Sequence, residues 1–254
     1  MKRVALPQVT LCAATSVNVA STIRALEASL AQIDFAQCLL FTDALERSAN
    51  PAIRIVPIGQ LKSARAYSQF LLGHLADYIE TSHCLVVQWD GHVVDAKRWD
   101  PAFLDQDYIG ASWPQYRDGH NVGNGGFSLR SRQLLQACQA SRFMGTAPED
   151  IQICRTHRPW LEAQGLRFAP QELADRFSAE RAGDPIASFG YHGVWHMPRV
   201  LGVERFWGVY RTLDERSTIR HDFGALLQQV VKGPGGAGRA VKLLTDHVLD
   251  TING

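Results

Sequence analysis

Runs dominated by apolar side chains alternate with segments of helical periodicity through the first third of the chain. The runs, of five to seven residues each, cover 9–14, 35–41, 53–58 and 84–88. Runs of this length without strict alternation are typical of strands that are buried on both faces of a sheet. Between them, apolar residues recur every three or four positions over 18–33 and 63–79, which predicts two helices. The alternation predicts an α/β fold with a mostly parallel central sheet flanked by helices.

Beyond about residue 100 the strand-like segments are shorter and glycine is more frequent. Residues 108–113 and 127–130 predict short strands, and the glycine-rich turn 123–126 precedes the second of them. Ser131 is a suitable N-cap for a helix that follows directly. Another helix is predicted to begin at Pro148, because proline and first-turn acids both favour a helix start.

The C-terminal part of the chain is predicted to be mainly helical. Residues 183–197 form a loop or strand rich in glycine and aromatic side chains, and 204–254 are helical apart from the glycine-rich segment 233–238. No stretch has the composition of a flexible linker between domains. We therefore expect one catalytic domain over 1–203, with a helical C-terminal extension over 204–254 that packs on the same domain.

Composition and charge restrict the class of protein. The chain is 46% hydrophobic, which suits a globular core, and its net charge of +1 gives no electrostatic basis for binding nucleic acid. No run of about 18 apolar residues predicts a transmembrane helix, and the basic residues Lys2 and Arg3 are not followed by the apolar run of a signal peptide. Five scattered cysteines without a Cys-x-x-Cys pair predict buried, reduced thiols rather than disulfides or zinc ligands. Together these features predict a cytoplasmic protein.

Polar side chains follow three of the predicted strands at the point where each strand ends. They are Thr15 and Ser16, then Thr42 and Asp43, then Gln88, Trp89 and Asp90. Ligands of parallel α/β sheets bind beyond the carboxyl ends of the strands, so these side chains can line one site. Polar residues at such positions also make turns, which is the alternative interpretation.

Asp90 is a candidate ligand for a divalent cation. It is followed by Gly91, which allows close approach to the backbone. Mg²⁺ and Mn²⁺ prefer oxygen ligands and commonly join one or two protein groups to a diphosphate. His92 lies close enough in sequence to add a ligand. The alternative role for Asp90 is that of a turn cap or a surface acid.

Three further clusters can take part in chemistry. Gly125 and Gly126 let the backbone pass close to a ligand; neither the P-loop nor the dinucleotide pattern is matched, and an ordinary tight turn is the alternative. Of the adjacent acids Glu149 and Asp150, one can deprotonate an acceptor hydroxyl, although both can simply cap a helix. His192 can bind a metal or make a structural hydrogen bond.

The order of these clusters resembles that of the GT-A glycosyltransferases. In that fold an acid follows a strand, a glycine loop precedes a short strand, an x-Glu-Asp motif opens a helix, and a metal-binding histidine comes late. Residues 81–130 are more closely similar to a bacterial family of glycosyltransferase-like proteins catalogued as a domain of unknown function. The similarity rests on Leu85-Val86-Val87-Gln88-Trp89-Asp90-Gly91, Asp107-Tyr108-Ile109-Gly110-Ala111 and Val122-Gly123-Asn124-Gly125-Gly126-Phe127-Ser128-Leu129-Arg130-Ser131. Pro148-Glu149-Asp150 and Phe189-Gly190-Tyr191-His192 extend it over most of residues 9–196.

The resemblance implies a Rossmann-like GT-A fold that transfers a sugar from a nucleotide-diphosphate sugar to a hydroxyl group of a glycan or glycolipid. It implies a divalent metal, Mn²⁺ or Mg²⁺, held by Asp90 and His192 with help from His92. Asp150 is the implied general base, with Glu149 as the alternative, and in-line attack inverts the anomeric carbon. A role in polysaccharide biosynthesis is an expectation from the resemblance alone.

The resemblance also assigns residues to the two substrates. The donor side comprises Thr15, Ser16, Asp43, Lys62, Arg65, Gln88, Trp89, Asp90, Gly125 and Gly126. The acceptor side comprises the aromatic residues Trp113, Phe127 and Trp195. Lys232, Arg239 and Lys242 can bring the C-terminal helices into peripheral contact with a membrane that carries the acceptor, although a solvated helix face is the favoured interpretation.

The motif departs from the family pattern at Gln88, where the usual Asp-x-Asp enzymes carry a first acid. The number of carboxylate ligands is therefore lower, and we expect His92 and His192 to compensate. Two other functions fit the same residues. A metal-dependent phosphoesterase or nucleotidyltransferase would use Asp90 with His92 and would not need the acids at the helix start. A non-catalytic protein would bind a sugar nucleotide or glycan without turnover.

Overall fold

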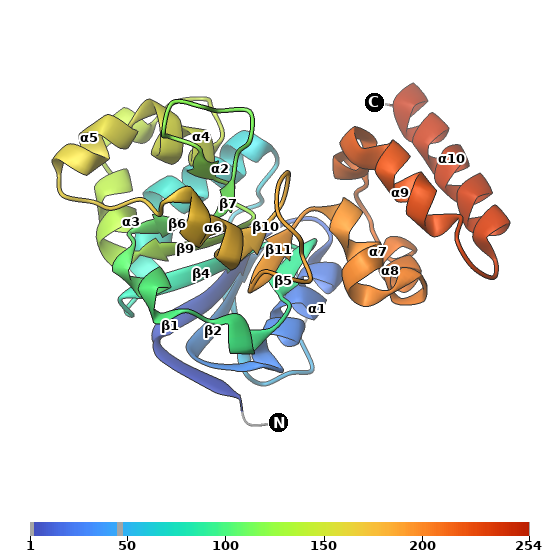
Figure 1. Ribbon diagram of the computed structural model, residues 1–254, viewed down its shortest axis with the longest axis horizontal. Helices are drawn as coiled ribbons and strands as arrows, with labels where there is room; N and C mark the ends of the chain where they lie inside the picture. Colours follow the sequence, from blue (N-terminus) through green and yellow to red (C-terminus); the bar gives the residue numbers. More distant parts are fainter. Residues whose placement is uncertain (1–2, 45–47, 254) are drawn as a thin grey trace. The chain divides into compact units, whose positions relative to one another are not determined.

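The computed structural model describes residues 3–44 and 48–253 and divides into two compact units, Met1–His192 and Gly193–Gly254 (Figure 1). The first unit contains the sheets with their helices, and the described residues of the second unit are helices and loops. The boundary lies earlier than the predicted domain end at residue 203, because α7 (Met197–Leu201) packs against α8 (Val203–Tyr210) within the second unit. Packing of the helical extension on the catalytic domain stays a prediction.

The first unit is built on a sheet whose described strands have the order β3-β2-β1-β4-β9-β6. Their bounds are β1 Val4–Ala14, β2 Ile33–Thr42, β3 Ile53–Pro57, β4 His83–Val87, β6 Tyr108–Ile109 and β9 Phe127–Ser131. The pairs that join β3, β2, β1 and β4 are parallel, whereas β9 pairs antiparallel with both β4 and β6. Each of the four apolar runs of the sequence forms one of the parallel strands, so the predicted α/β fold with a mostly parallel sheet is confirmed.

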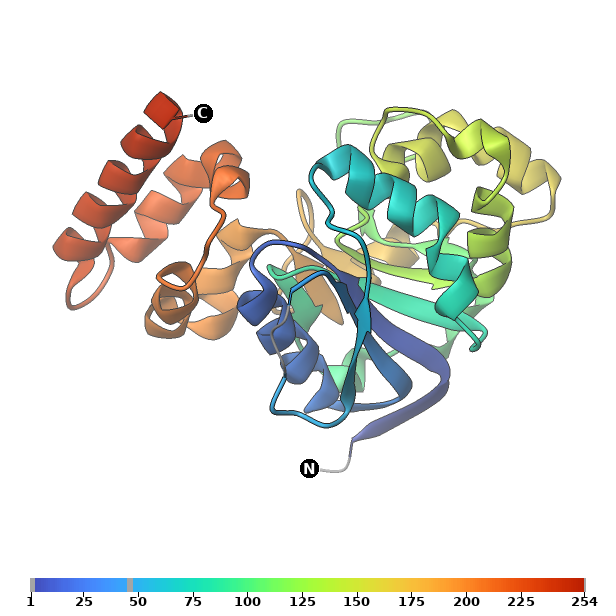
Figure 2. The same cartoon turned by 180° about the vertical axis from the view of Figure 1, so that it is seen from behind.

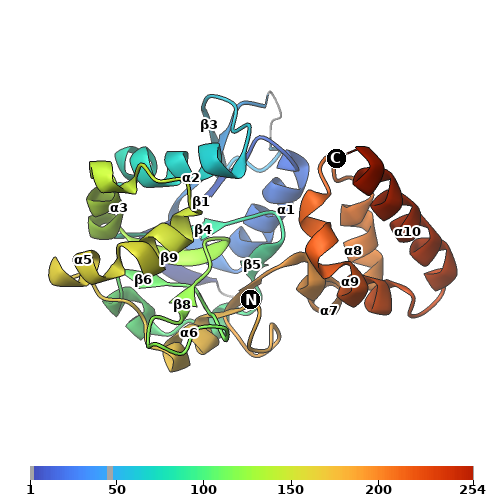
Figure 3. The ribbon, with the colours of Figure 1, turned by 90° about the horizontal axis from the view of Figure 1, so that it is seen from above.

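Helices cover both faces of this sheet. They are α1 (Val19–Leu30), α2 (Ala64–Gly73), α3 (Arg132–Cys138) and α6 (Gln171–Phe177). Leu11 of β1 shares an apolar cluster with Leu26 of α1 and with residues of α6, whereas its neighbour Cys12 shares the opposite cluster with Phe70 of α2. Figure 2 shows α1 in blue and α2 in cyan on opposite faces of the sheet, and Figure 3 shows α2 and α3 across the sheet from α6. Adjacent strand residues therefore pack under different helices, as the period of two requires.

Several elements differ in extent from the prediction. The first strand begins at Val4 rather than at residue 9, and pairs there with Ile33. The helix predicted over 63–79 ends at Gly73 and continues as a 3₁₀ turn over Leu75–Tyr78, because His74 leaves helical geometry. The strand predicted over 108–113 divides at Gly110, where a Cβ would lie 1.8 Å from the carbonyl oxygen of Gly123.

The predicted helix starts are confirmed. Ser131 accepts a hydrogen bond from the backbone N–H of Leu134 at 3.0 Å, as an N-cap does. Pro148 stands immediately before α4 (Glu149–Ile151), which passes into a π-helical turn over Gln152–Thr156. The helix α5 (Arg158–Ala163) follows it.

Two small sheets complete the first unit. One consists of β10 (Ser178–Ala179), β11 (Gly190–His192) and β5 (Gly91–Val93), with β11 in the centre, parallel to β10 and antiparallel to β5. The other pairs β7 (Ala111–Ser112) with β8 (Val122–Gly123). All five cysteines are buried with free thiols, which confirms the predicted reduced core thiols.

The second unit consists of α7, α8, α9 (Phe223–Val230) and α10 (Gly236–Asn253), with short 3₁₀ turns. The long helix α10 begins inside the segment 233–238, which was predicted to be a loop. Arg239 is buried, donates to Val230 O at the end of α9 and forms an ion pair with Glu204 at 2.6 Å. It is therefore a structural residue rather than part of a basic membrane-binding patch.

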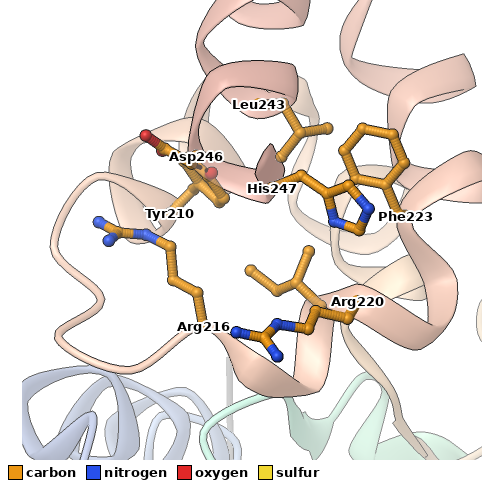
Figure 4. A pocket seen from close by; sticks show the side chains of 8 residues that line it. Tyr210, Arg216, Arg220, Phe223, Leu243, Asp246 and His247 are labelled. Carbon is orange, nitrogen blue, oxygen red and sulfur yellow. Dashed lines mark hydrogen bonds between the residues drawn. The ribbon is translucent and has the colours of Figure 1, made fainter. Parts of the chain in front are cut away.

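Lys242, another residue of that predicted patch, forms an ion pair with Asp246 at 3.0 Å. A small pocket in this unit is lined in part by Arg216, Arg220 and Asp246, and the ring of Phe223 stacks on that of His247 beside it (Figure 4). Within the described residues, no helix combines the length and the apolar composition that crossing a bilayer requires.

Candidate active site

The predicted metal motif, Gln88-Trp89-Asp90, and the glycine-rich turn meet at the carboxyl edge of the large sheet. Gln88 follows β4, and Gly126 directly precedes β9. Because these strands are antiparallel and pair Val87 with Phe127, the end of one meets the start of the other. The N–H of Gln88 donates to the carbonyl oxygen of Gly126 at 2.9 Å. Two clusters that are far apart in the sequence therefore lie side by side.

His192 reaches the same place from the small sheet. It pairs with Gly91 of β5, so Asp90, the residue before Gly91, lies beside its imidazole. The Nε2 atom of His192 is 3.4 Å from Asp90 Oδ1 and 3.2 Å from Gln88 Oε1. A Cβ on Gly126 would lie 2.1 Å from the same Nε2 atom, so the imidazole packs directly against this glycine. The structure thus brings Gln88, Asp90, Gly126 and His192 together.

These atoms fit a divalent cation. Asp90 is buried, and its Oδ1 atom accepts no hydrogen bond from the described part of the chain. Two ligands that each lie about 2.0–2.2 Å from one cation are about 3 Å apart, which is close to the spacing of the Asp90, His192 and Gln88 atoms. The described residues contain no complete set of three His, Cys, Asp or Glu ligands. In such a site Gln88 would supply an amide oxygen where the usual motif has its first acid, and substrate oxygens or water would fill the other positions.

Tyr67 of α2 orients the Gln88 amide. The Gln88 Nε2 group donates to the Tyr67 hydroxyl at 2.9 Å, which turns the amide oxygen toward His192. Tyr67 belongs to no motif and is one of several aromatic side chains on an amphipathic helix, so its sequence context does not mark it as a site residue. Only the approach of α2 to the end of β4 distinguishes it.

Two carboxylates flank His192. Besides Asp90 at Nε2, Glu180 Oε1 lies 3.6 Å from Nδ1. Burial alone lowers the pKa of His192, but Asp90 and Glu180 together overcome this and raise it to about 10. Glu180 is a second site residue that the sequence does not mark, because it belongs to no recognisable motif and stands in a loop after β10.

His92 does not join this group. In the antiparallel pairing of β5 with β11 it lies opposite Tyr191, whereas His192 lies opposite Gly91, so the two histidines point to opposite faces of the small sheet. Its ring packs edge-on against Tyr191 with centroids 5.0 Å apart, and burial lowers its pKa. The structure contradicts the prediction that His92 is a metal ligand beside His192.

Asp150 lies on the other side of the glycine-rich turn. Its Oδ2 atom accepts the N–H of Gly125 at 3.2 Å, and its Oδ1 atom accepts the N–H of Ile151 at 2.8 Å. Burial and the neighbouring Glu149 raise the pKa of Asp150 to about 6, although its two backbone hydrogen bonds act in the opposite direction. The carboxyl is therefore ionised at neutral pH and basic enough to take up a proton.

Glu149 has a different environment. It is buried and forms an ion pair with the fully buried Arg130 at 3.0 Å. Its backbone N–H donates to Ser68 Oγ at 3.2 Å. A Cβ on Gly125 would lie 2.0 Å from Glu149 Oε1, so the turn also packs on this carboxylate. These contacts contradict the alternative prediction of Glu149 as general base, because its carboxylate is already engaged in the core.

The predicted residues for the donor base and phosphates lie at the same edge of the sheet. Ser16, after β1, accepts the N–H of Leu61 at 2.8 Å, which ties the strand end to the segment that leads into α2. Thr15 donates its N–H to Phe41 O of β2 at 2.9 Å. The charged residues are exposed, and within the described residues none of them forms an ion pair: Asp43, Lys62 and Arg65.

The aromatic residues assigned to the acceptor are mostly structural. Trp113 is buried, and its indole lies over Gly123, where a Cβ would be 2.1 Å from the ring. Phe127 is fully buried against Phe177 and Phe189. Trp89, which the resemblance assigned to the donor side, is only 9% exposed. The structure contradicts Trp113 and Phe127 as acceptor contacts, whereas Trp195 belongs to the second unit and its assignment stays a prediction.

Comparison with known proteins identifies the family. A family model described as "Protein of unknown function (DUF5672)" matches residues 51–192. The chain belongs to this family. The predicted membership of a family catalogued as a domain of unknown function is thereby confirmed, and the matched region contains the residues from Gln88 to His192 that form the site. No curated protein sequence matches the chain.

Two solved structures are similar to the chain at low sequence identity. One is a glycosyltransferase involved in the glycosylation of the major capsid of PBCV-1, with a TM-score of 0.48 and 10% identity, covering 80% of this chain and 99% of that chain. The other is HddC from Yersinia pseudotuberculosis, with a TM-score of 0.33 and 16% identity, covering 51% of this chain and 78% of that chain.

Proposed function

We propose that this protein is a metal-dependent glycosyltransferase that moves a sugar from a nucleotide-diphosphate sugar to a hydroxyl acceptor. The observation that supports it best is the position of the Gly125–Gly126 turn. One glycine donates its N–H to Asp150, and the other packs against the imidazole of His192, which lies 3.4 Å from Asp90. A basic carboxylate and the side chains that would hold a cation therefore lie on the two sides of one turn, at the sheet edge where α/β proteins bind ligands.

The donor diphosphate belongs beside Asp90 and His192. Gln88, Asp90 and His192 would hold a Mn²⁺ or Mg²⁺ ion, which when bound neutralises the charge that develops on the leaving diphosphate. The Gly125–Gly126 turn packs against Glu149 and His192, so it fixes the imidazole that would face the metal and the diphosphate. Lys62 and Arg65, both exposed, supply positive charge at the same edge of the sheet.

Asp150 acts as the general base. Its carboxylate takes the proton of the acceptor hydroxyl as the oxygen attacks the anomeric carbon. The new carbon–oxygen bond forms on the face opposite the leaving group, the bond to the β-phosphate oxygen breaks, and the nucleoside diphosphate leaves, so the anomeric configuration inverts. A base of this kind contributes roughly a hundred- to ten-thousandfold to the rate.

Thermal-shift measurements with a panel of nucleotide sugars, with and without Mn²⁺, test the donor class. A ligand that binds only the folded protein raises its unfolding temperature, and we expect a shift with at least one nucleotide sugar that grows when Mn²⁺ is added. Absence of any shift across the panel would contradict the proposal.

The variant Asp150→Asn separates this function from its two rivals. A transferase should lose turnover and keep the thermal shift with its donor. A phosphoesterase or nucleotidyltransferase that uses Asp90 with His92 is disfavoured by the orientation of His92, and its activity would survive the substitution. A non-catalytic binding protein would show the donor shift and no turnover even as wild type.

A further inference from the structure

Glu180 is placed beside His192 by the backbone of the small sheet. The parallel pairing of β10 with β11 joins Ser178 to Gly190 and Ala179 to Tyr191. One step further along the same register, Glu180 comes alongside His192. On the other flank, antiparallel β5 brings Gly91 opposite His192 and Asp90 next to it. The histidine therefore ends the central strand of a sheet whose two outer strands each deliver one carboxylate.

The imidazole has a defined orientation between these carboxylates. Its Nε2 atom faces Asp90 Oδ1 at 3.4 Å, and its Nδ1 atom faces Glu180 Oε1 at 3.6 Å. Gly126 closes one side of the ring, since a Cβ there would lie 2.1 Å from Nε2 and 2.3 Å from Cδ2. The side chains of His192 and Glu180 are only 17% and 14% exposed. Rotation of the ring would separate both nitrogen atoms from the oxygens that face them.

We infer that Glu180 is a positioning residue that holds Nδ1 of His192 and thereby directs Nε2 at the cation site formed with Asp90. The inference rests on the proposed function, because it assumes that this site binds a divalent cation. Histidines that ligate metals commonly give their other ring N–H to a carboxylate, which fixes the ring and makes the ligating nitrogen more basic. Loss of such a carboxylate typically lowers metal affinity about 10- to 100-fold.

The test measures binding of Mn²⁺ alone to the full chain, without donor or acceptor. The electron paramagnetic resonance signal of free Mn²⁺ gives the dissociation constant, and electron spin echo modulation detects the ¹⁴N coupling of a bound imidazole. We expect Glu180→Ala to weaken Mn²⁺ binding about 10- to 100-fold. Glu180→Gln, which keeps an oxygen that can accept the Nδ1–H bond, should weaken it less. The ¹⁴N coupling should persist in both variants and disappear in His192→Ala.

Glu172→Gln provides the matched control, because it removes one negative charge from an exposed position in the first turn of α6. It should leave the Mn²⁺ affinity unchanged. Circular dichroism of each variant at the measuring temperature separates lost affinity from lost fold, and Glu180→Gln serves as the readout if the alanine variant unfolds.

The outcomes separate this inference from the proposed function. Wild-type binding of Mn²⁺ with equal affinity in both Glu180 variants overturns the positioning role and leaves the metal site standing. A loss in Glu180→Ala as large as that in His192→Ala, with the ¹⁴N coupling of the bound Mn²⁺ unchanged, also overturns it, since Glu180 would then be a ligand itself. Absence of Mn²⁺ binding in the wild type overturns the metal-dependent function itself, and the inference with it.

Discussion

Glu149 and Asp150 are adjacent at the start of one helix, yet their side chains have different surroundings. Successive residues of a helix point about 100° apart. Glu149 consequently turns into the core and pairs with Arg130, whereas Asp150 turns toward the N–H of Gly125. Two acids that the sequence could only offer as alternatives thus have separate roles, one structural and one proposed to be catalytic.

The raised pKa of Asp150 predicts opposite effects of pH on activity and on stability. As a base it must be unprotonated, so the transfer rate should fall about tenfold per pH unit below its pKa of about 6. Because this pKa lies above the ordinary aspartate value of 3.8, the ionised carboxyl destabilises the folded state above about pH 6, and the penalty is relieved as the pH falls toward 4. Asp150→Asn should therefore unfold at a higher temperature than wild type at pH 7.5, and the difference should shrink at pH 4.5. Initial rates across this pH range check the effect on activity, and calorimetry checks the effect on stability. A transfer rate that does not change with pH down to pH 5 would contradict the role of Asp150.

Glu149→Gln should affect the fold before it affects the chemistry. The substitution leaves the charge of Arg130 buried without its counter-ion, and breaking a buried pair in this way costs about 3–5 kcal/mol. Urea unfolding measures the loss. Asp118→Asn is the matched control. It also removes the charge of an acid that pairs with an arginine, Arg155 at 2.7 Å, but the side chain of Asp118 is 55% exposed. That variant should change stability little. Equal losses of unfolding free energy in the two variants would show that the cost does not depend on burial of the Arg130–Glu149 pair.

At the scale of elements, the Gly125–Gly126 turn connects the acid of α4 with the histidine of β11. The turn can approach both only because neither residue carries a side chain. In Gly126→Ala the new Cβ would lie 2.1 Å from His192 Nε2, so the imidazole must move away from Asp90. We expect the Mn²⁺ affinity to fall while the fold is kept.

Gly59→Ala is the control for this substitution, since a Cβ at Gly59 meets no atom of the described residues within 4 Å. It should bind Mn²⁺ as the wild type does. Isothermal titration calorimetry of both variants gives the comparison. If Gly126→Ala binds Mn²⁺ with wild-type affinity, His192 is not held against this turn in the way the structure describes.

The sequence predicted elements well where burial on both faces produces a long apolar signal, as in β1, β2, β3 and β4. It could not predict the three strands of the small sheet, because two or three residues carry no readable period. The orientation of His92 depends on the register between β5 and β11, which are far apart in sequence, and a shift of one residue would have exchanged its face with that of Gly91. The error in the metal ligands therefore came from register, which local pattern does not contain.

Aromatic residues near the motifs show a related limit. Trp113 and Phe127 stand in sequence next to the glycine-rich cluster, where a sugar-stacking role is chemically reasonable. Both are buried by partners from other segments, with Gly190 making room for the ring of Phe127. Their position in sequence beside the glycine-rich cluster indicates which chemistry these side chains could perform. It does not indicate whether they are exposed. Glu180 is the reverse case, a residue without a motif that only the pairing of β10 with β11 brings to the site.

At the scale of the whole molecule, the site residues on which the proposed chemistry depends all lie within Met1–His192. This unit also contains the apolar clusters on the two faces of the large sheet and a third one around Tyr108, Leu134 and Cys154. The fragment 1–193 should therefore unfold cooperatively and bind Mn²⁺ with the affinity of the full chain. If the helical unit contributes to acceptor binding, for example through Trp195, the fragment should lose transfer activity while it still binds donor and metal. Thermal unfolding followed by circular dichroism tests the first expectation, and titration of Mn²⁺ with transfer assays tests the others. A fragment without a cooperative transition would mean that the two units fold as one, and that the α/β unit depends on the helices for its own stability.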